Sequence, residues 1–269
     1  MKANLSRVVR RGVLAAAMSA AFASSAFALP QFTLDPTASS GSFTGAQVTA
    51  DNVIVSNYST VRLDTATGSF SESGFLSVQN FQLGGSILST PDLNSSYGLY
   101  IQFTGTGSQT AGDPATSVTI GSFDSLEYTL FGFTGSATFG FDAGNNPTIT
   151  GASDAVALAT GSLIEGNVFT TPTGEPFTPG ATAIVTFTPL PSESGFFASP
   201  VPFYSQAFAS FVNTASQVAT IDGGFTITQG GGAFNLAGTT APIPEPQTYA
   251  LMLAGLAAMG FVVRRRSGT

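Results

Sequence analysis

Short stretches in which apolar and polar residues alternate recur through the middle of the chain. Between residues 52 and 64, Val53, Val55 and Val61 fall on one face of an extended segment, and polar side chains occupy most of the other. A period of two residues is typical of a strand with one buried and one solvated face. The pattern therefore predicts a half-buried antiparallel strand in this segment.

A second alternating stretch covers residues 117–133. Its pattern places Ile120 and Leu126 on the buried face of a strand. Thr119 and Glu127 are expected on the solvated face. Shorter stretches of the same kind occur at residues 99–103, 137–141, 183–187 and 225–227.

Turn signals rich in glycine separate these stretches. They occur at residues 84–85, 112–114, 144–147, 172–180, 222–224 and 230–232. Residues 203–215 fit a helical stripe as well as a strand face, and their β-branched and aromatic context favours the strand. We expect an all-β fold, an antiparallel β-sandwich or jelly roll, flanked by an N-terminal signal helix and a C-terminal hydrophobic helix.

The first 28 residues have the layout of a secretory signal peptide. A basic region ends at Arg11, an apolar run continues to Phe22, and small residues lead to an Ala-x-Ala site. This order of basic, apolar and small-residue regions directs export. We expect cleavage after Ala28, with Ala26 and Ala28 as the recognition residues, so that residues 1–28 form the signal peptide.

The other end of the chain combines two prolines, an apolar run and a basic tail. Pro244, Glu245 and Pro246 precede an uncharged run over residues 249–263. The run is followed by Arg264, Arg265 and Arg266. As a helix it would measure roughly 22 Å, which can cross a hydrocarbon core of roughly 30 Å with interfacial flanks and local thinning. The basic cluster then orients the tail toward the cytoplasm.

These signals predict four regions. After the signal peptide we expect an all-β extracellular domain over residues 29–237. A Pro- and Thr-rich spacer with the Pro-Glu-Pro sequence follows over residues 238–247. Residues 248–269 are then the C-terminal membrane helix and the arginine tail.

The C-terminal arrangement resembles the PEP-CTERM sorting signal of Gram-negative bacteria. The likeness rests on the Pro-Glu-Pro sequence, Tyr249, the apolar residues 250–256 and the terminal arginines. It implies that the segment holds the precursor in the inner membrane until an exosortase removes the tail near Pro-Glu-Pro. Because the prolines oppose both helix and sheet pairing, this strip stays extended for the protease. An ordinary tail anchor is the alternative.

Composition and charge exclude several classes of function. The chain has no His, Cys or Trp, which excludes Ser-His-Asp and Cys-His catalysis, His-ligated zinc and disulfides. Fifteen acids and a single cation, Arg62, give residues 29–246 a formal charge of −14. A surface of this sign repels phosphates, so we expect no nucleic-acid partner. No cofactor is implied.

Two carboxylate pairs are candidates for glycoside hydrolysis, which uses one acid and one base. They are Asp124 with Glu127 and Asp142 with Asp154. The odd spacing of the first pair predicts that its members lie on opposite faces of one strand. The lack of Trp also removes a platform on which a sugar ring could stack. We therefore expect solvated acids and no catalytic residue.

A loop rich in oxygen atoms is a candidate calcium site. Its members are Asp142, Gly144, Asn145 and Asn146. The same residue types are required by a hairpin turn, so we assign no metal site. Four tyrosines could contact polysaccharide, although a core or turn position is the stronger expectation for each. They are Tyr58, Tyr97, Tyr100 and Tyr204.

The middle of the chain also resembles the flocculation-associated subfamily of PEP-CTERM proteins. The likeness rests on Asp51-Asn52 before Tyr58 and on segments 68–71, 208–214 and 223–235, in which Ala233 stands where a serine is expected. It implies a surface protein linked to floc formation in bacteria that produce exopolysaccharide.

We thus expect a non-enzymatic exported protein of the cell surface or extracellular matrix that supports exopolysaccharide-associated aggregation, in flocs or biofilms. Its expected partners are an exosortase, exopolysaccharide or other matrix components and, transiently, the inner membrane. A secreted polysaccharide-active enzyme and a calcium-dependent glycan-binding module are the alternatives. Activity on the glycan would identify the first, and sugar binding abolished by a chelator the second.

Overall fold

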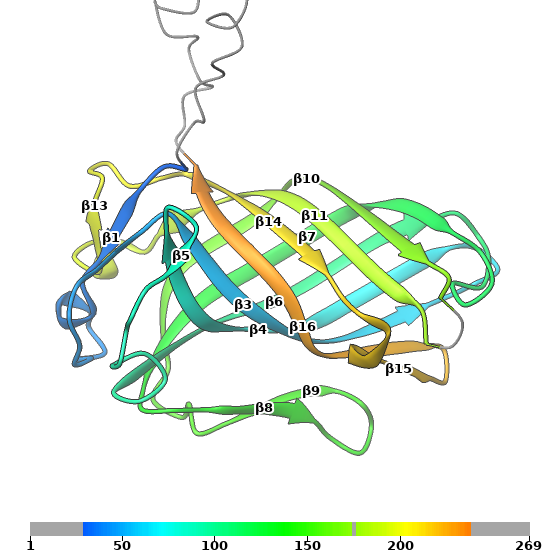
Figure 1. The fold of residues 1–269 in the computed structure, drawn as a ribbon, viewed down its shortest axis with the longest axis horizontal. Helices are drawn as coiled ribbons and strands as arrows, with labels where there is room; N and C mark the ends of the chain where they lie inside the picture. The colour runs from blue at the N-terminus through cyan, green and yellow to red at the C-terminus, as the bar shows by residue number, and fades with distance from the viewer. Residues whose placement is uncertain (1–28, 174–175, 238–269) are drawn as a thin grey trace, which may run out of the picture.

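Eight long antiparallel strands close into a β-barrel (Figure 1). The structure is a computed structural model that describes residues 29–173 and 176–237. The barrel strands are β3 (Asn52–Leu63), β4 (Ser69–Leu83), β6 (Tyr97–Gln109), β7 (Thr119–Thr134), β10 (Val156–Thr171), β11 (Thr178–Thr186), β14 (Gln206–Val212) and β16 (Gly224–Ala237).

The barrel is an up-and-down meander in which each strand pairs with its neighbours along the chain. β16 pairs with β14 on one side and with β3 on the other, and this last pairing closes the cylinder. The prediction of an antiparallel all-β fold is confirmed, but the structure corrects the sandwich or jelly roll to a closed barrel. Inward and outward positions alternate in the same way in both architectures, so the alternation alone does not distinguish them.

Smaller elements surround the barrel. The strands β1 (Phe32–Leu34), β2 (Val48–Ala50) and β13 (Phe197–Ser199) form a separate sheet, seen at the left end of the barrel in Figure 1. The hairpin of β8 (Thr138–Phe141) and β9 (Pro147–Thr150) lies against the outside. The remaining elements are β5 (Ser86–Ile87), β12 (Thr188–Pro189), β15 (Val218–Ile221) and the 3-10 helices η1 (Pro36–Ala38), η2 (Pro191–Glu193) and η3 (Ala215–Gln217).

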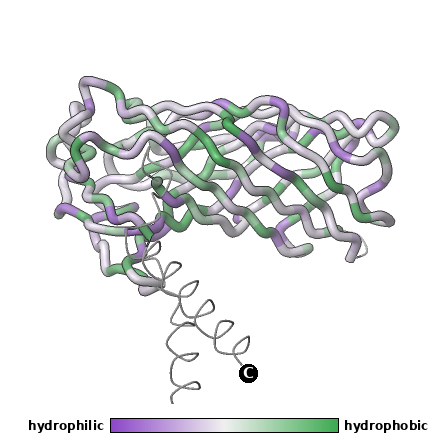
Figure 2. The backbone as a smooth tube through the Cα atoms, turned by 90° about the horizontal axis from the view of Figure 1, so that it is seen from above, coloured by the Kyte–Doolittle hydropathy of each residue, from purple (hydrophilic) through white to green (hydrophobic). Residues whose placement is uncertain are grey.

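Apolar side chains fill much of the barrel interior. Val53, Val55 and Val61 are buried, as their alternation predicts. Phe32 and Leu34 of the end sheet belong to the same core cluster as the first two of these valines, so that sheet packs against the barrel core. Figure 2 shows hydrophobic and hydrophilic positions interleaved along the strands, as expected for walls with one inward and one outward face.

A β-bulge in β7 reverses the alternation predicted for the first part of this strand. Asp124 is the extra residue in the pairing with β6. Before the bulge, Ile120 is 66% exposed, whereas Thr119 is buried and shares a hydrogen bond of 2.6 Å with the Thr170 hydroxyl. After the bulge, Leu126 packs against the core as predicted. One inserted residue exchanges the inward and outward faces of the strand residues before it. The faces predicted for Thr119 and Ile120 were therefore wrong.

The glycines at 230–232 lie inside β16, and the turn predicted for them was wrong. A Cβ atom at Gly230 would stand 2.1 Å from Oδ1 of Asn213, and one at Gly232 would stand 2.2 Å from the ring of Phe211. These glycines therefore admit neighbouring side chains instead of reversing the chain.

Glycines and aromatic rings face each other across paired strands at five places. The pairs are Gly98 with Phe133, Gly107 with Phe70, Gly161 with Tyr128, Gly180 with Phe169 and Gly232 with Phe211. A Cβ atom on any of these glycines would meet the opposite ring at 2.1–2.4 Å. Each ring covers the backbone of the glycine opposite it, which has no side chain. Glycine and aromatic residues therefore occur as cross-strand pairs in this chain.

A buried carboxylate joins η2 to the segment after η1. Glu193 is 1% exposed and accepts hydrogen bonds from the Ser39 hydroxyl at 2.9 Å and from the Ser40 amide at 3.0 Å. The Ser40 hydroxyl donates to its other oxygen. Burial by itself raises the pKa of Glu193, but the hydrogen bonds from Ser40 and Ser39 outweigh it, so the pKa lies below its ordinary value of 4.5.

We expect Glu193→Gln to destabilise the protein by about 1.5–3 kcal/mol at neutral pH, because it weakens charge-assisted hydrogen bonds. A carboxylate whose pKa is lower in the folded state contributes stability above its unfolded pKa and loses it as the pH falls through the folded pKa. The difference between the variant and the unaltered protein should therefore shrink below about pH 4.5. Urea denaturation at pH 7 and pH 3.5 measures it. Glu165→Gln, at an exposed carboxylate, is the control, and an equal loss in both variants would contradict the assignment.

The predicted signal helix and C-terminal membrane helix lie outside the described residues. Within residues 29–173 and 176–237, no helix is long and apolar enough to span a bilayer.

Candidate functional site

A polar groove crosses the outer wall of the barrel over β6, β7, β10 and β12. Its volume is about 510 Å³, within the size range of small-ligand sites. Thr104, Glu127 and Ser162 pair directly and form one row across the strands. The second row consists of Gln102, Thr129, Thr160 and Thr188.

Hydroxyl groups dominate this groove. Thr186 also lines it, and its Oγ1 atom accepts a hydrogen bond of 2.8 Å from the Ser162 amide. Glu127 is the only carboxylate among the lining residues. The groove therefore offers many neutral donors and acceptors but a single carboxylate, which is one fewer than the carboxylate acid and base of glycoside hydrolysis.

The structure places both acids of the first candidate pair on the outer surface. The expectation that Asp124 and Glu127 lie on opposite faces was wrong, because Asp124 is the bulged residue and the alternation shifts there. Only Glu127 reaches the groove.

The acids of the second candidate pair each accept hydrogen bonds from backbone amides. Asp154 Oδ2 accepts from the Thr134 amide at 3.1 Å. Asp142 Oδ1 accepts from the amides of Gly144 and Asn146, both at 2.8 Å. Hydrogen bonds from Asn146 and Thr134 lower the pKa values of Asp142 and Asp154, respectively. Asp142 is thus a local turn acceptor, whereas Asp154 binds the loop before β10 to the end of β7.

The oxygen-rich loop at residues 142–146 forms the turn between β8 and β9. Asn145 adopts a left-handed conformation with φ of 61°, as such a turn requires. Among the described residues, no group of three or more acidic side chains is arranged to hold a metal ion.

The four candidate tyrosines are either buried in the fold or hydrogen-bonded to it. Tyr58, Tyr97 and Tyr100 are buried, and the ring of Tyr58 stacks on Phe139 of the outer hairpin at 5.4 Å. The hydroxyl of Tyr204 donates to the carbonyl of Gln31 at 2.7 Å. The three buried rings therefore offer no free face on which a sugar could stack.

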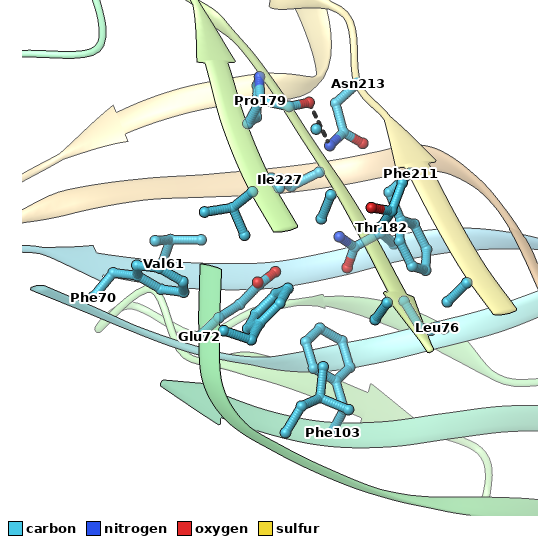
Figure 3. A pocket seen from close by; sticks show the side chains of 18 of the residues that line it. Val61, Phe70, Glu72, Leu76, Phe103, Pro179, Thr182, Phe211, Asn213 and Ile227 are labelled. Carbon is cyan, nitrogen blue, oxygen red and sulfur yellow. Dashed lines mark hydrogen bonds between the residues drawn. The ribbon is translucent and has the colours of Figure 1, made fainter. Parts of the chain in front are cut away.

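The barrel interior contains a second site, which the sequence reasoning missed. It is a cavity of about 100 Å³, lined mainly by apolar side chains such as Phe103 and Phe225. Glu72 of β4 lies among them (Figure 3). The alternation along β4 could have revealed it, because Glu72 lies an even number of residues from Phe70 and Leu76 and so shares their inward face.

Polar side chains continue from Glu72 across the inner wall. Asn57 is buried and faces Gly230 of β16, and Asn213 lies beyond that glycine at the end of β14. The Nδ2 atom of Asn213 donates to the Pro179 carbonyl at 3.1 Å (Figure 3), which fixes its Oδ1 atom as the free acceptor. The Oδ1 atoms of Asn57 and Asn213 and the hydroxyl of Ser59 have no hydrogen-bond partner within the described structure.

The Glu72 carboxyl has no cationic partner within the described structure. Arg62 is the single cation between residues 29 and 246, and its guanidinium donates to the carbonyls of Asp222 and Gly144 at the exposed surface. Burial raises the pKa of Glu72, and the nearby Ser59 and Asn57 side chains offset this only in part.

Comparison with known proteins finds one match. The PEP-CTERM protein-sorting motif matches residues 242–266, a stretch that contains Pro244 and Pro246 and lies outside the described residues. No curated protein and no solved structure matches the chain.

The matched motif defines the class of protein, an exported protein with a C-terminal membrane-anchoring sorting signal. This chain is accordingly an exosortase-targeted exported protein.

Proposed function

We propose that this protein is a non-enzymatic component of the cell surface or extracellular matrix that binds exopolysaccharide and so supports aggregation in flocs or biofilms. The observation that carries the proposal is the hydroxyl-lined groove on the outer wall of an exported barrel. Hydroxyl and amide side chains recognise sugars through hydrogen bonds, and paired rows across four strands present them as an extended surface.

Charge favours a neutral glycan as the ligand. Residues 29–246 carry a formal charge of −14, which repels acidic polysaccharides as well as other copies of the protein. Within the groove, Glu127 is one charge among uncharged partners. The single carboxylate also favours binding over hydrolysis.

Removing two central hydroxyls should weaken glycan binding. Thr129 and Thr160 face each other across β7 and β10. We therefore expect Thr129→Val combined with Thr160→Val to reduce affinity for the organism's own polysaccharide about thirtyfold, because two hydrogen bonds of about 1 kcal/mol each are lost. Valine keeps the β-branched shape. Pull-down of the full-length protein on the immobilised polysaccharide measures the change.

Thr220→Val provides the matched control, because this exposed threonine lies on β15, outside the groove. Equal binding by the double variant and the control would contradict the groove as the contact surface. Release of reducing sugar from the polysaccharide would instead identify an enzyme. Loss of binding on chelation, restored by calcium, would identify a calcium-dependent module.

A further inference from the structure

Buried oxygen atoms without hydrogen-bond partners lie on the inner wall of the barrel. Three oxygen atoms lack partners there: the Oδ1 atoms of Asn57 and Asn213, and the hydroxyl of Ser59. The residues are 4%, 3% and 0% exposed, respectively, so bulk solvent does not satisfy them. Buried polar groups without partners are costly, so this arrangement indicates a bound group that donates hydrogen bonds.

Glu72 adds a carboxylate to the same wall. It lines the cavity together with Asn57, and Ser59 lies near its oxygens. The surrounding lining residues are largely apolar, among them Phe103 and Phe123. Glu72 is half-buried, and a cationic partner would stabilise a carboxylate in such surroundings. The described chain supplies no cation inside the barrel.

We propose that the cavity beside Glu72 is a binding site for a small primary alkylammonium ion. An ammonium group has three donors and one positive charge, which match the carboxylate and the neighbouring orphan acceptors. The alkyl part then lies against the apolar lining. This site is inside the barrel and is independent of the glycan groove on the outer wall.

The size of the cavity limits the ligand. Its volume is about 100 Å³, whereas a cavity of about 150 Å³ admits benzene. The site therefore suits an ion of about four to six non-hydrogen atoms. Gly230 leaves room for the Asn213 amide beside Asn57, because a Cβ atom at residue 230 would stand 2.1 Å from the Asn213 Oδ1 atom.

The test compares three probes of one shape on the full-length protein. They are n-butylammonium, n-butanol and butyrate, titrated calorimetrically at neutral pH. We expect n-butylammonium to bind at least tenfold more tightly than n-butanol, and butyrate not to bind. Equal binding of the ammonium and the alcohol, or no binding of any probe, would overturn the proposal.

Two variants locate the effect. Glu72→Gln keeps the shape of the side chain and should abolish the preference for n-butylammonium over n-butanol, whereas Glu165→Gln removes an exposed charge and should leave it unchanged. Asn57→Leu removes an orphan acceptor and should weaken ammonium binding severalfold. A preference that persists in folded Glu72→Gln would also overturn the proposal. Thermal unfolding verifies that each variant is folded.

Discussion

Replacing Pro244, Glu245 and Pro246 together with alanine should leave nearly all of the exported protein with its C-terminal tail attached. The sorting motif covers these residues, and exosortase processing depends on the motif. Alanine also favours a helix, whereas proline opposes one, so the substitution should change the conformational preference of the cleavage region. Intact-mass measurement of membrane and extracellular fractions should find the unaltered protein without residues 1–28 and without the arginine tail.

The basic tail provides a second test of the same step. Replacing Arg264, Arg265 and Arg266 with serine removes the positive charge that we expect to keep the tail in the cytoplasm. We expect accumulation of unprocessed precursor. An extracellular form of the unaltered protein that still carries these arginines would contradict exosortase processing, and normal processing of the serine variant would show that the cluster is dispensable.

The second large effect concerns the aromatic cluster between the outer face of the barrel and the β8–β9 hairpin. Gly98→Ala should destabilise the protein by about 1–3 kcal/mol, because it overpacks a filled site. The new Cβ atom would stand 2.1 Å from the ring of Phe133, which is 1% exposed and packs against Tyr100. For a chain of this size, the melting temperature should fall by roughly 3–10 °C.

Gly140→Ala is the matched control. It also lies in a strand, but an added Cβ atom there meets nothing closer than the Thr148 hydroxyl at 4.0 Å. Its stability should change by no more than about 0.5–1 kcal/mol, and in the favourable direction, since alanine restricts the unfolded chain. Similar losses at Gly98 and Gly140 would mean that backbone freedom, and not the ring opposite Gly98, sets the requirement for glycine.

Much of the secondary structure was predictable because strand patterning is local. The alternation around Val55 identified β3, and the strand expected within residues 203–215 is β14. The predictions failed at Asp124 and Gly230, where bulges interrupt the pairing and shift the period of two. A bulge depends on the partner strand as much as on its own residues, so a pattern read along one segment does not reveal it.

The candidate sites also divide into those formed by neighbouring residues and those formed by separate strands. Asp142 and Asn146 were recognisable as turn residues because their hydrogen bonds join neighbours in the chain. The groove and the cavity were not recognisable in this way. Pairing of separate strands brings Thr129 beside Thr160. In the same way it places Glu72 on the same inner wall as Asn57.

By itself, the sequence determined the C-terminal sorting motif, the absence of His and Cys side chains, the acidic charge and the all-β antiparallel class. These depend on composition or on the order of adjacent residues. Only the tertiary structure decided that β16 pairs with β3. This pairing turns one face of every strand into a shared interior and removes the sheet edges, so the inward position of Glu72 becomes a site enclosed by the whole barrel.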